Sequence, residues 1–271
     1  MEKKRTDDLL VEQGLVKSKG EALSHILAGN VFTTKEIKIL TAGEKLPAGT
    51  ELYIKGQEKK YVSRGGLKLE EAVRLFNLDL NNQIVLDIGA STGGFTDVSL
   101  KNGAKLVYAL DVGTNQLAWE LRNHDRVVVM EKTNFRYSLP DDFKEGKPHF
   151  ATIDVSFISL ELILPPLYPI LEEEGEVIAL IKPQFEAARE DVGEGGIVKD
   201  FEVYRAILKH ILNFAESLSF GVLHLGVSPI TGTKGNIEFL AHLKKDVKSM
   251  ENKDEQIEEV LNEASYRLNE A

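Results

Sequence analysis

The sequence predicts an α/β protein in which a mostly parallel sheet follows a small α+β segment at the front of the chain. Beyond about residue 80, short apolar runs alternate with stretches of helical periodicity, which is the pattern of βαβ units. Before residue 60, two short helical stretches are followed by β-type runs. The 271 residues, 42% of them hydrophobic, are enough for one large domain and one small one.

The front segment is expected to form a domain over residues 1–60. Apolar residues recur at helical spacing over residues 5–30, and Gly14 and Gly20 are expected to interrupt the helices. The expected strands of this segment are residues 31–34, 35–40 and 51–55. The polar stretch 56–60 is the expected boundary, which leaves residues 61–271 for the larger domain.

Seven apolar runs are expected to form the strands of the larger domain. They are residues 84–88, 106–110, 127–130, 150–154, 177–181, 222–225 and 237–240. Helices are expected between most of them, for instance around 67–76 and 204–218, and an amphipathic helix is expected at the end of the chain. Ligands of such sheets bind beyond the carboxyl ends of the strands, so the residues that follow the strands are the candidates for chemistry.

The composition excludes several classes of site. There is no cysteine, which excludes a disulfide framework, a thiolate zinc site and a cysteine nucleophile. The six histidines are scattered without ligand spacing, so we expect no metal site. No apolar stretch approaches the roughly 18 residues of a membrane span, and the charged first residues do not resemble a signal peptide. We therefore expect a cytoplasmic protein without a membrane partner.

The net charge of −10 argues against a nucleic-acid partner, but the charge is unevenly distributed. Residues 1–60 contain 11 lysines and arginines and 9 aspartates and glutamates, whereas the rest of the chain contains 22 and 34. The basic excess therefore lies in the front segment. Charge alone decides nothing about the partner.

A glycine-rich turn follows the first strand of the larger domain, over residues 87–95. Its glycines fall as G-x-x-x-G-G, not as the G-x-G-x-x-G of dinucleotide enzymes. This variant suits a ligand without a pyrophosphate, such as S-adenosylmethionine. Asp111 ends the next strand, where a carboxylate can accept both hydroxyls of a ribose. The alternatives are an ordinary glycine-rich turn and an acid that caps a helix.

Two charged residues end neighbouring strands of the predicted sheet. Asp154 and Lys182 should lie side by side, because a charge at the end of an apolar strand is costly to bury without a partner. They are either a structural ion pair or part of a reaction site. Lys68, at the start of a helix, would alone be taken as a solvated lysine, whereas Glu238, an acid in an apolar strand, is alone equally consistent with a structural and a functional role.

Several motifs make the chain resemble the TlyA proteins, which are often labelled haemolysins. They are residues 62–69, 87–95, 111–113, 116–119, 156–160, 182–186, 192–196 and 235–238, so the resemblance spans nearly the whole chain. It implies a ribosomal RNA 2′-O-methyltransferase that uses S-adenosylmethionine. It also implies a Rossmann-like class I methyltransferase sheet behind a small S4-like RNA-binding domain.

The family uses a Lys-Asp-Lys-Glu tetrad, which matches Lys68, Asp154, Lys182 and Glu238 here. We expect Lys182 to accept the proton of the 2′-hydroxyl, and Lys68 to stabilise negative charge on the oxygen. The two acids would orient the lysines. The expected cofactor-binding residues are Asp87, Gly89, Ala90, Ser91, Thr92, Gly93, Gly94, Phe95, Asp111, Asn134 and Phe157.

The expected partner is ribosomal RNA or a ribosomal subunit, with cytidine as the nucleotide that the resemblance suggests. The expected RNA-binding residues are Arg5, Lys17, Ser18, Lys19, Lys35 and Arg64. For any one lysine the alternative is a solvated face. Two other functions stay open: an RNA-binding ribosome factor with an inactive methyltransferase domain, and a membrane-lytic haemolysin.

Overall fold

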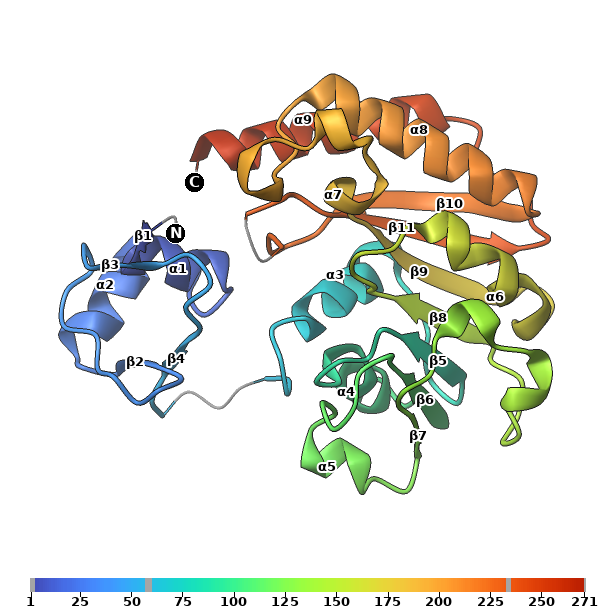
Figure 1. Ribbon diagram of the computed structural model, residues 1–271, viewed down its shortest axis with the longest axis horizontal. Helices are drawn as coiled ribbons and strands as arrows, with labels where there is room; N and C mark the ends of the chain where they lie inside the picture. Colours follow the sequence, from blue (N-terminus) through green and yellow to red (C-terminus); the bar gives the residue numbers. More distant parts are fainter. Residues whose placement is uncertain (1–2, 57–59, 233–234, 271) are drawn as a thin grey trace.

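A seven-stranded sheet forms the centre of the larger part of the protein (Figure 1). The structure is a computed structural model that describes residues 3–56, 60–232 and 235–270. The strands are β5 (Ile84–Ile88), β6 (Leu106–Leu110), β7 (Val127–Met130), β8 (Phe150–Ile153), β9 (Glu176–Ile181), β10 (Phe220–Val227) and β11 (Phe239–Lys245). Their order in space is β7-β6-β5-β8-β9-β11-β10, and within this sheet only β11 runs in the opposite direction to the other six strands. The seven predicted strands and the mostly parallel sheet are confirmed.

The position of β11 differs from the prediction. The sequence predicts a strand at residues 237–240, but β11 begins at Phe239 and continues to Lys245. The later part was missed because it contains His242 and Lys245, polar residues that the structure buries. Glu238 therefore lies immediately before the strand. Because β11 is antiparallel to β9, its first residue pairs with Ile181, the last residue of β9.

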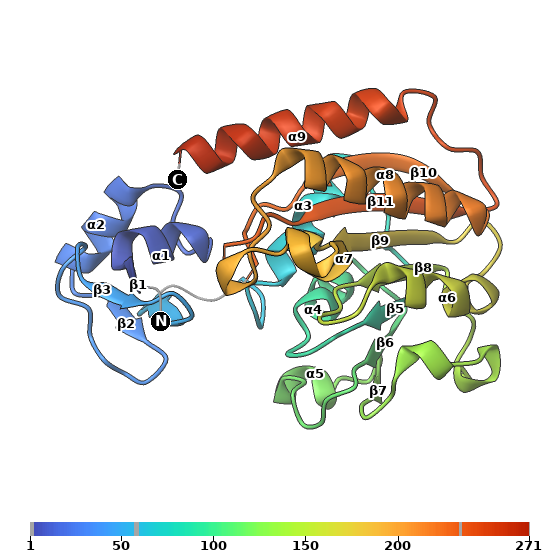
Figure 2. The same cartoon turned by 45° about the horizontal axis from the view of Figure 1, so that its top comes forward.

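Helices cover both faces of the sheet, which gives three layers (Figure 2). One face packs on α3 (Gly66–Phe76), α4 (Gly94–Lys101) and α5 (Trp119–Arg122), and the other on α6 (Leu164–Ile170), α8 (Phe201–Ser217) and α9 (Lys253–Glu270). Successive strand residues point to opposite faces. Leu86 and Ile88 thus join the core beneath α6 and α8, while Val85 joins the core beneath α3 and α4. The predicted helices, including the terminal one, are confirmed.

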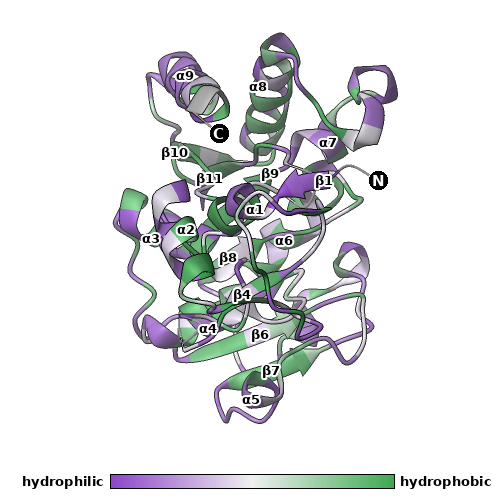
Figure 3. Cartoon of the chain, turned by 90° about the vertical axis from the view of Figure 1, so that its left-hand side faces the viewer, coloured by the Kyte–Doolittle hydropathy of each residue, from purple (hydrophilic) through white to green (hydrophobic). Residues whose placement is uncertain are grey.

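Short helical segments complete the connections of the larger part. They are α7 (Pro183–Glu186) and the 3-10 turns η1 (Phe135–Tyr137), η2 (Pro140–Asp142), η3 (Leu160–Leu162), η4 (Arg189–Asp191) and η5 (Glu194–Gly196). Figure 3 shows the hydrophobic residues concentrated in the strands and the polar residues on the outer turns of α9. This distribution is the one expected for a sheet buried on both faces.

The front of the chain forms a small α+β region with a hydrophobic cluster of its own. Its elements are β1 (Lys3–Arg5), α1 (Thr6–Glu12), α2 (Lys19–Leu27), β2 (Val31–Thr33), β3 (Lys45–Pro47) and β4 (Leu52–Ile54). β1 pairs with β3, and β2 pairs with β4, both antiparallel. The two predicted helices are confirmed, but Gly20 lies inside α2 and does not interrupt it.

The strand predicted at residues 35–40 is wrong. A turn follows β2 instead, with Glu36 at a positive φ of 61°, and a single bridge joins Lys38 to Phe32. The short strands β1 and β3 were missed because they contain lysines, arginine and proline, which weaken the β pattern. The predicted boundary at 56–60 includes residues 57–59, which lie outside the described residues.

The small region packs beside the edge of the sheet at which the parallel strands end (Figure 1). Residues of both parts, including Lys4 and Gln13 on one side and Arg64 and Thr231 on the other, line a shared gap of about 60 Å³. The front region therefore lies next to the place where ligands of such a sheet bind.

Candidate active site

The four residues of the predicted tetrad line one pocket of about 300 Å³. Asp154 directly follows β8 and Lys182 directly follows β9, so both lie at the carboxyl edge of the sheet. Glu238 reaches the same edge because it precedes the antiparallel strand β11. Lys68 comes from the first turn of α3, which packs over the sheet from one side.

The tetrad forms a continuous chain of ion pairs. Lys182 Nζ lies 2.5 Å from Asp154 Oδ1, and Lys68 Nζ lies 3.2 Å from Asp154 Oδ2. Lys68 Nζ also lies 2.7 Å from Glu238 Oε2. The prediction that Asp154 and Lys182 lie side by side is confirmed. Their roles in a reaction remain predictions.

Burial and mutual attraction decide the charge states of the tetrad. The exposed fractions are only 7% for Lys68 and 3% for Glu238. Burial acts to lower the pKa of Lys68, but the nearby carboxylates of Asp154 and Glu238 outweigh it, so the pKa of Lys68 is raised. Burial acts to raise the pKa of Asp154, but Lys68 and Lys182 outweigh it, so that pKa is lowered. Lys68 is therefore held protonated and Asp154 ionised at neutral pH.

The glycine-rich turn between β5 and α4 forms the neighbouring wall of the pocket. Gly89 has a φ of +88°, and a Cβ there would lie 2.6 Å from the carbonyl oxygen of Asp154. A Cβ on Gly94 would lie 2.4 Å from Ser63 Oγ. These two glycines are therefore required, because the turn packs closely against the backbone that follows β8 and against the start of α3.

Two acids hold this turn from behind. The Asp111 carboxylate accepts hydrogen bonds from the backbone N–H groups of Ser91 and Gly113, both at 2.7 Å. Asp87 is fully buried and accepts hydrogen bonds from the hydroxyls of Thr96 at 2.7 Å and Thr152 at 3.1 Å. Burial raises the pKa of Asp87 to about 7, despite these hydrogen bonds. Both acids thus have a structural task in the turn.

The structure places most, but not all, of the expected cofactor-binding residues at the pocket. Those that line it are Asp87, Gly89, Ala90, Ser91, Thr92, Gly94 and Phe95. Gly93 and Asp111 lie in or behind the turn but are not part of the pocket lining. Asn134 caps the turn η1, and Phe157 is 91% exposed with its ring 5.1 Å from that of Phe185. Neither of these two residues lines the pocket.

Several lining residues were not singled out from the sequence. They are Glu51, Ser63, Gly65, Ser156, Gln184, Phe185, Thr231 and Gly232. Most follow or precede a tetrad residue within a motif, and that proximity was the available signal. Ser156 Oγ, for example, accepts a hydrogen bond of 3.3 Å from Lys182 Nζ. No sequence feature marked Glu51 as a pocket residue, because it belongs to the front region and reaches the pocket only through the fold.

Glu186 fastens the loop after β9 to the loop after β8. Its carboxylate accepts hydrogen bonds from Ser159 Oγ at 2.6 Å and from the N–H of Leu160 at 2.9 Å. The acceptor lies in the loop after β9, and the donors lie in the loop after β8. Burial raises the pKa of Glu186. This clamp limits relative movement of the loops that hold Asp154 and Lys182.

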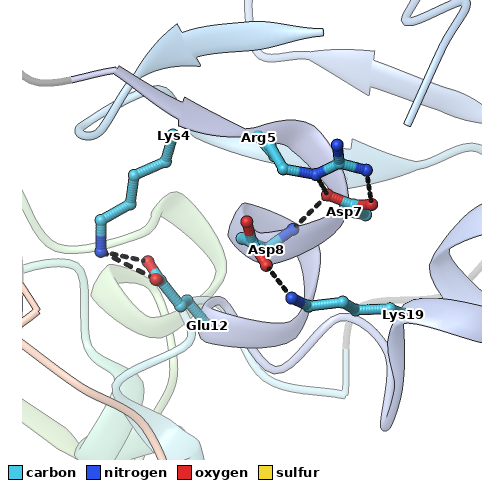
Figure 4. A network of polar contacts seen from close by, with 6 residues as sticks. All are labelled: Lys4, Arg5, Asp7, Asp8, Glu12 and Lys19. Atoms are coloured by element: carbon cyan, nitrogen blue, oxygen red, sulfur yellow. Dashed lines mark hydrogen bonds and ion pairs between the residues drawn. The ribbon is translucent and has the colours of Figure 1, made fainter. Parts of the chain in front are cut away.

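The predicted RNA-binding residues do not form one uninterrupted basic surface. Arg5 pairs with Asp7, and Lys19 pairs with Asp8 (Figure 4). Ser18 caps α2 by accepting a hydrogen bond from the N–H of Glu21. Lys17 and Lys35 are exposed, while Arg64 lies between the small region and the tetrad pocket. Part of the expected positive charge is therefore neutralised locally.

The described part of the chain contains neither a candidate metal site nor a candidate membrane span. Within residues 3–56, 60–232 and 235–270, no group of three or more histidine and acidic side chains is arranged to hold a metal ion. In the same part of the chain, no helix is sufficiently long and apolar to cross a membrane.

The pocket meets the chemical requirements of S-adenosylmethionine. The backbone of the glycine-rich turn and the exposed residues Ser91 and Thr92 face the pocket beside β5. Asp111 lies at the end of β6, the neighbouring strand, where a carboxylate suits ribose hydroxyls. The tetrad lies on the other side, after β8 and β9. The glycine-rich turn and the tetrad thus lie on opposite sides of one pocket.

Comparisons with known proteins agree with this arrangement. A family model described as FtsJ-like methyltransferase matches residues 61–245. The chain is 50% identical to "Putative rRNA methyltransferase YqxC" of Bacillus subtilis, over 99% of this chain and 96% of that protein. It is 38% identical to "16S/23S rRNA (cytidine-2'-O)-methyltransferase TlyA" of Mycobacterium tuberculosis, over 89% of each. A solved structure, "Putative hemolysin from Streptococcus thermophilus", is 51% identical with a TM-score of 0.81, covering 100% of this chain and 98% of that one.

Proposed function

Because the chain belongs to the TlyA family of rRNA methyltransferases, with an FtsJ-like catalytic domain, we propose that it methylates a ribose 2′-hydroxyl of ribosomal RNA. S-adenosylmethionine supplies the electrophilic methyl group when it is bound. The observation that carries the proposal is the ion-pair chain Lys182–Asp154–Lys68–Glu238, which lies beside the glycine-rich turn in one pocket.

The chemistry of a 2′-hydroxyl suits this arrangement. The hydroxyl is a weak nucleophile near neutral pH, so it must lose its proton as it attacks and must lie in line with the methyl group. Lys182 faces the pocket and is the proposed proton acceptor; its ammonium, which pairs with Asp154, must release a proton before its nitrogen can accept that of the hydroxyl. Lys68, held protonated by two carboxylates, stabilises the negative charge that develops on the oxygen.

The two acids act as positioning residues in this proposal. Asp154 contacts both lysines and fixes their separation, and Glu238 holds Lys68 from the far side. The expected cofactor-binding residues of the glycine-rich turn, with Asp111, would hold the methyl donor on the β5 and β6 side. The target ribose would then lie over the ends of β8, β9 and β11.

We further propose that residues 1–60 are an S4-like RNA-binding domain and that the target is a cytidine. The basic excess of this segment and its separate hydrophobic cluster support the first point. The second rests on the name of the M. tuberculosis relative. Ribosomal subunits as substrates imply a cytoplasmic site of action. The intact tetrad and turn argue against an inactive methyltransferase domain.

A product analysis tests the proposed reaction. Purified protein would be incubated with methyl-labelled S-adenosylmethionine and ribosomal subunits from cells that lack the gene. A 2′-O-methyl group removes the nucleophile that cleaves RNA in alkali, so the label should appear in alkali-resistant dinucleotides. Label in free bases or in alkali-sensitive mononucleotides would contradict a 2′-hydroxyl target.

A further inference from the structure

The two-stranded β2–β4 sheet of the front region has an outer face that does not belong to the hydrophobic core. Val31, Thr33, Leu52 and Ile54 point inward and are buried. Phe32 and Tyr53, which alternate with them, point to the other face and are half-buried. This face, with Phe32, Tyr53, Lys38 and Lys55, is called the β2–β4 outer face below.

The side chains of this face lie in a row across adjacent backbones. Lys38 forms a bridge with Phe32, and Phe32 pairs directly with Tyr53, so the three lie next to one another. The two rings are stacked, with centroids 5.6 Å apart and an angle of 22° between their planes. Lys55 follows Tyr53 by two residues, and its Nζ lies 5.9 Å from the Phe32 ring centroid.

The cations of this face differ from those near α1. Lys4, Arg5 and Lys19 are each paired with a carboxylate (Figure 4). Within the described part of the chain, neither Lys38 nor Lys55 has a carboxylate partner within 4.0 Å. Their charges are therefore available to an external anion. Glu36 also contacts the face, because its carboxylate accepts a hydrogen bond of 2.7 Å from the Tyr53 hydroxyl.

The face lies close in the chain to one residue of the tetrad pocket. Glu51, immediately before β4, is part of the pocket lining. Strand residues advance by about 3.3 Å each, so Tyr53 lies about 7 Å from that point, and Lys55 follows directly after the strand. The charge also changes along the strand, from Glu51 at the pocket to Lys55 at the far end. A strand of RNA that leaves the pocket can follow this direction.

We propose that the β2–β4 outer face binds unpaired RNA next to the target nucleotide, with a base stacked on the Phe32–Tyr53 pair and phosphates at Lys38 and Lys55. Aromatic rings flanked by cations are the usual means of holding single strands, because every base has a face that can stack. The proposal rests on the proposed function.

The test uses the full chain and a short single-stranded RNA that carries 2-aminopurine, whose fluorescence falls when it stacks. In Phe32→Leu/Tyr53→Leu, apolar volume is kept and the aromatic planes are lost. We expect about 10-fold weaker binding and loss of the quenching. In Lys38→Gln/Lys55→Gln, we expect weaker binding and a salt dependence reduced by about 1.4 in log–log slope, at about 0.7 per phosphate contact.

The matched control is Lys105→Gln/Lys144→Gln, which removes the same charge. Both lysines are exposed and precede β6 and β8, so they lie at the opposite edge of the sheet from the pocket. RNA affinity should stay at the wild-type level. Wild-type affinity and quenching in the aromatic variant, or equal binding of the same RNA as a duplex, would overturn the proposal. If the aromatic variant does not fold, the lysine variant tests the proposal: a salt slope equal to that of the wild type would overturn it.

The same preparations separate this proposal from the proposed function. Suppose that the wild-type protein methylates ribosomal RNA but both double variants keep its RNA affinity and salt slope. The proposed RNA binding by the β2–β4 outer face is then wrong, and the proposed function stands. If the wild-type protein stacks the probe on this face but forms no 2′-O-methyl product, the proposed reaction is wrong. The proposed RNA binding by the face then stands.

Discussion

The ammonium of Lys182 lies 2.5 Å from Asp154 Oδ1, because the two residues directly follow neighbouring parallel strands. The other oxygen of Asp154 contacts Lys68. One carboxylate thus holds two buried cations at a fixed separation, and its removal has consequences for both activity and folding.

Replacing Lys182 by alanine should abolish methyl transfer and leave the fold intact. The proposed proton acceptor is lost, while Asp154 keeps Lys68 as a partner. Methyl transfer to ribosomal subunits and a thermal melt on the same sample would measure the two effects. A folded variant with a rate near that of the wild type would refute the role of Lys182.

Replacing Asp154 by alanine should abolish turnover and also lower the free energy of unfolding by about 3–5 kcal/mol. The reason is that Lys68 and Lys182 would stay buried without the carboxylate between them. Urea unfolding gives the stability change. The shape-preserving variant Asp154→Asn should be equally inactive, and a fully active Asn variant would show that the negative charge is not needed.

Replacing Gly89 by alanine should weaken S-adenosylmethionine binding and destabilise the fold by about 1–3 kcal/mol. The Cβ would lie 2.6 Å from the Asp154 carbonyl oxygen, and the φ of +88° is strained for alanine. Isothermal titration and thermal melts would measure both changes. The matched control is Gly20→Ala, at a helical position where the Cβ meets nothing closer than 3.8 Å. It should be neutral or stabilising by up to about 1 kcal/mol.

Replacing Asp87 by asparagine should change how stability depends on pH. Burial raises the pKa of Asp87 from 3.8 to about 7, so between these values the folded chain holds a proton that the unfolded chain has released. Wild-type stability therefore falls by up to about 1.4 kcal/mol per pH unit as the pH rises through this window. The variant lacks this loss.

The stability difference, variant minus wild type, should thus increase from pH 4 to pH 7 and level off above pH 7. Urea unfolding at a series of pH values would measure it. A difference that does not change with pH would show that Asp87 ionises at its ordinary pKa in the folded protein.

The order of the secondary structure followed from local patterns. Alternating apolar runs and helical periods predicted all seven strands of the sheet, because burial on both faces demands unbroken apolar residues. The apolar pattern did not reveal strand residues that are polar but buried, because their partners lie on other strands. β11 continues through His242, whose ring Nε2 lies 3.1 Å from Glu176, and no local pattern reveals that partner.

Part of the candidate site was also predictable, since residues that follow parallel strands must meet at one edge. That argument brought Asp154 and Lys182 together from the sequence alone. It gave no reason for Lys68 or Glu238, which were selected through the family resemblance. Their positions depend on how α3 packs over the sheet and on the direction of β11.

The sequence by itself determined the α/β class, the two-part organisation and the glycine-rich turn, because these are set by interactions between residues close in the chain. Only the tertiary structure decided which cations are free. Asp8 of α1 neutralises Lys19 of α2, whereas the turn after β2 brings Lys38 beside Phe32 and Tyr53. Charges and rings act at distances of a few ångströms in space, and the fold sets those distances.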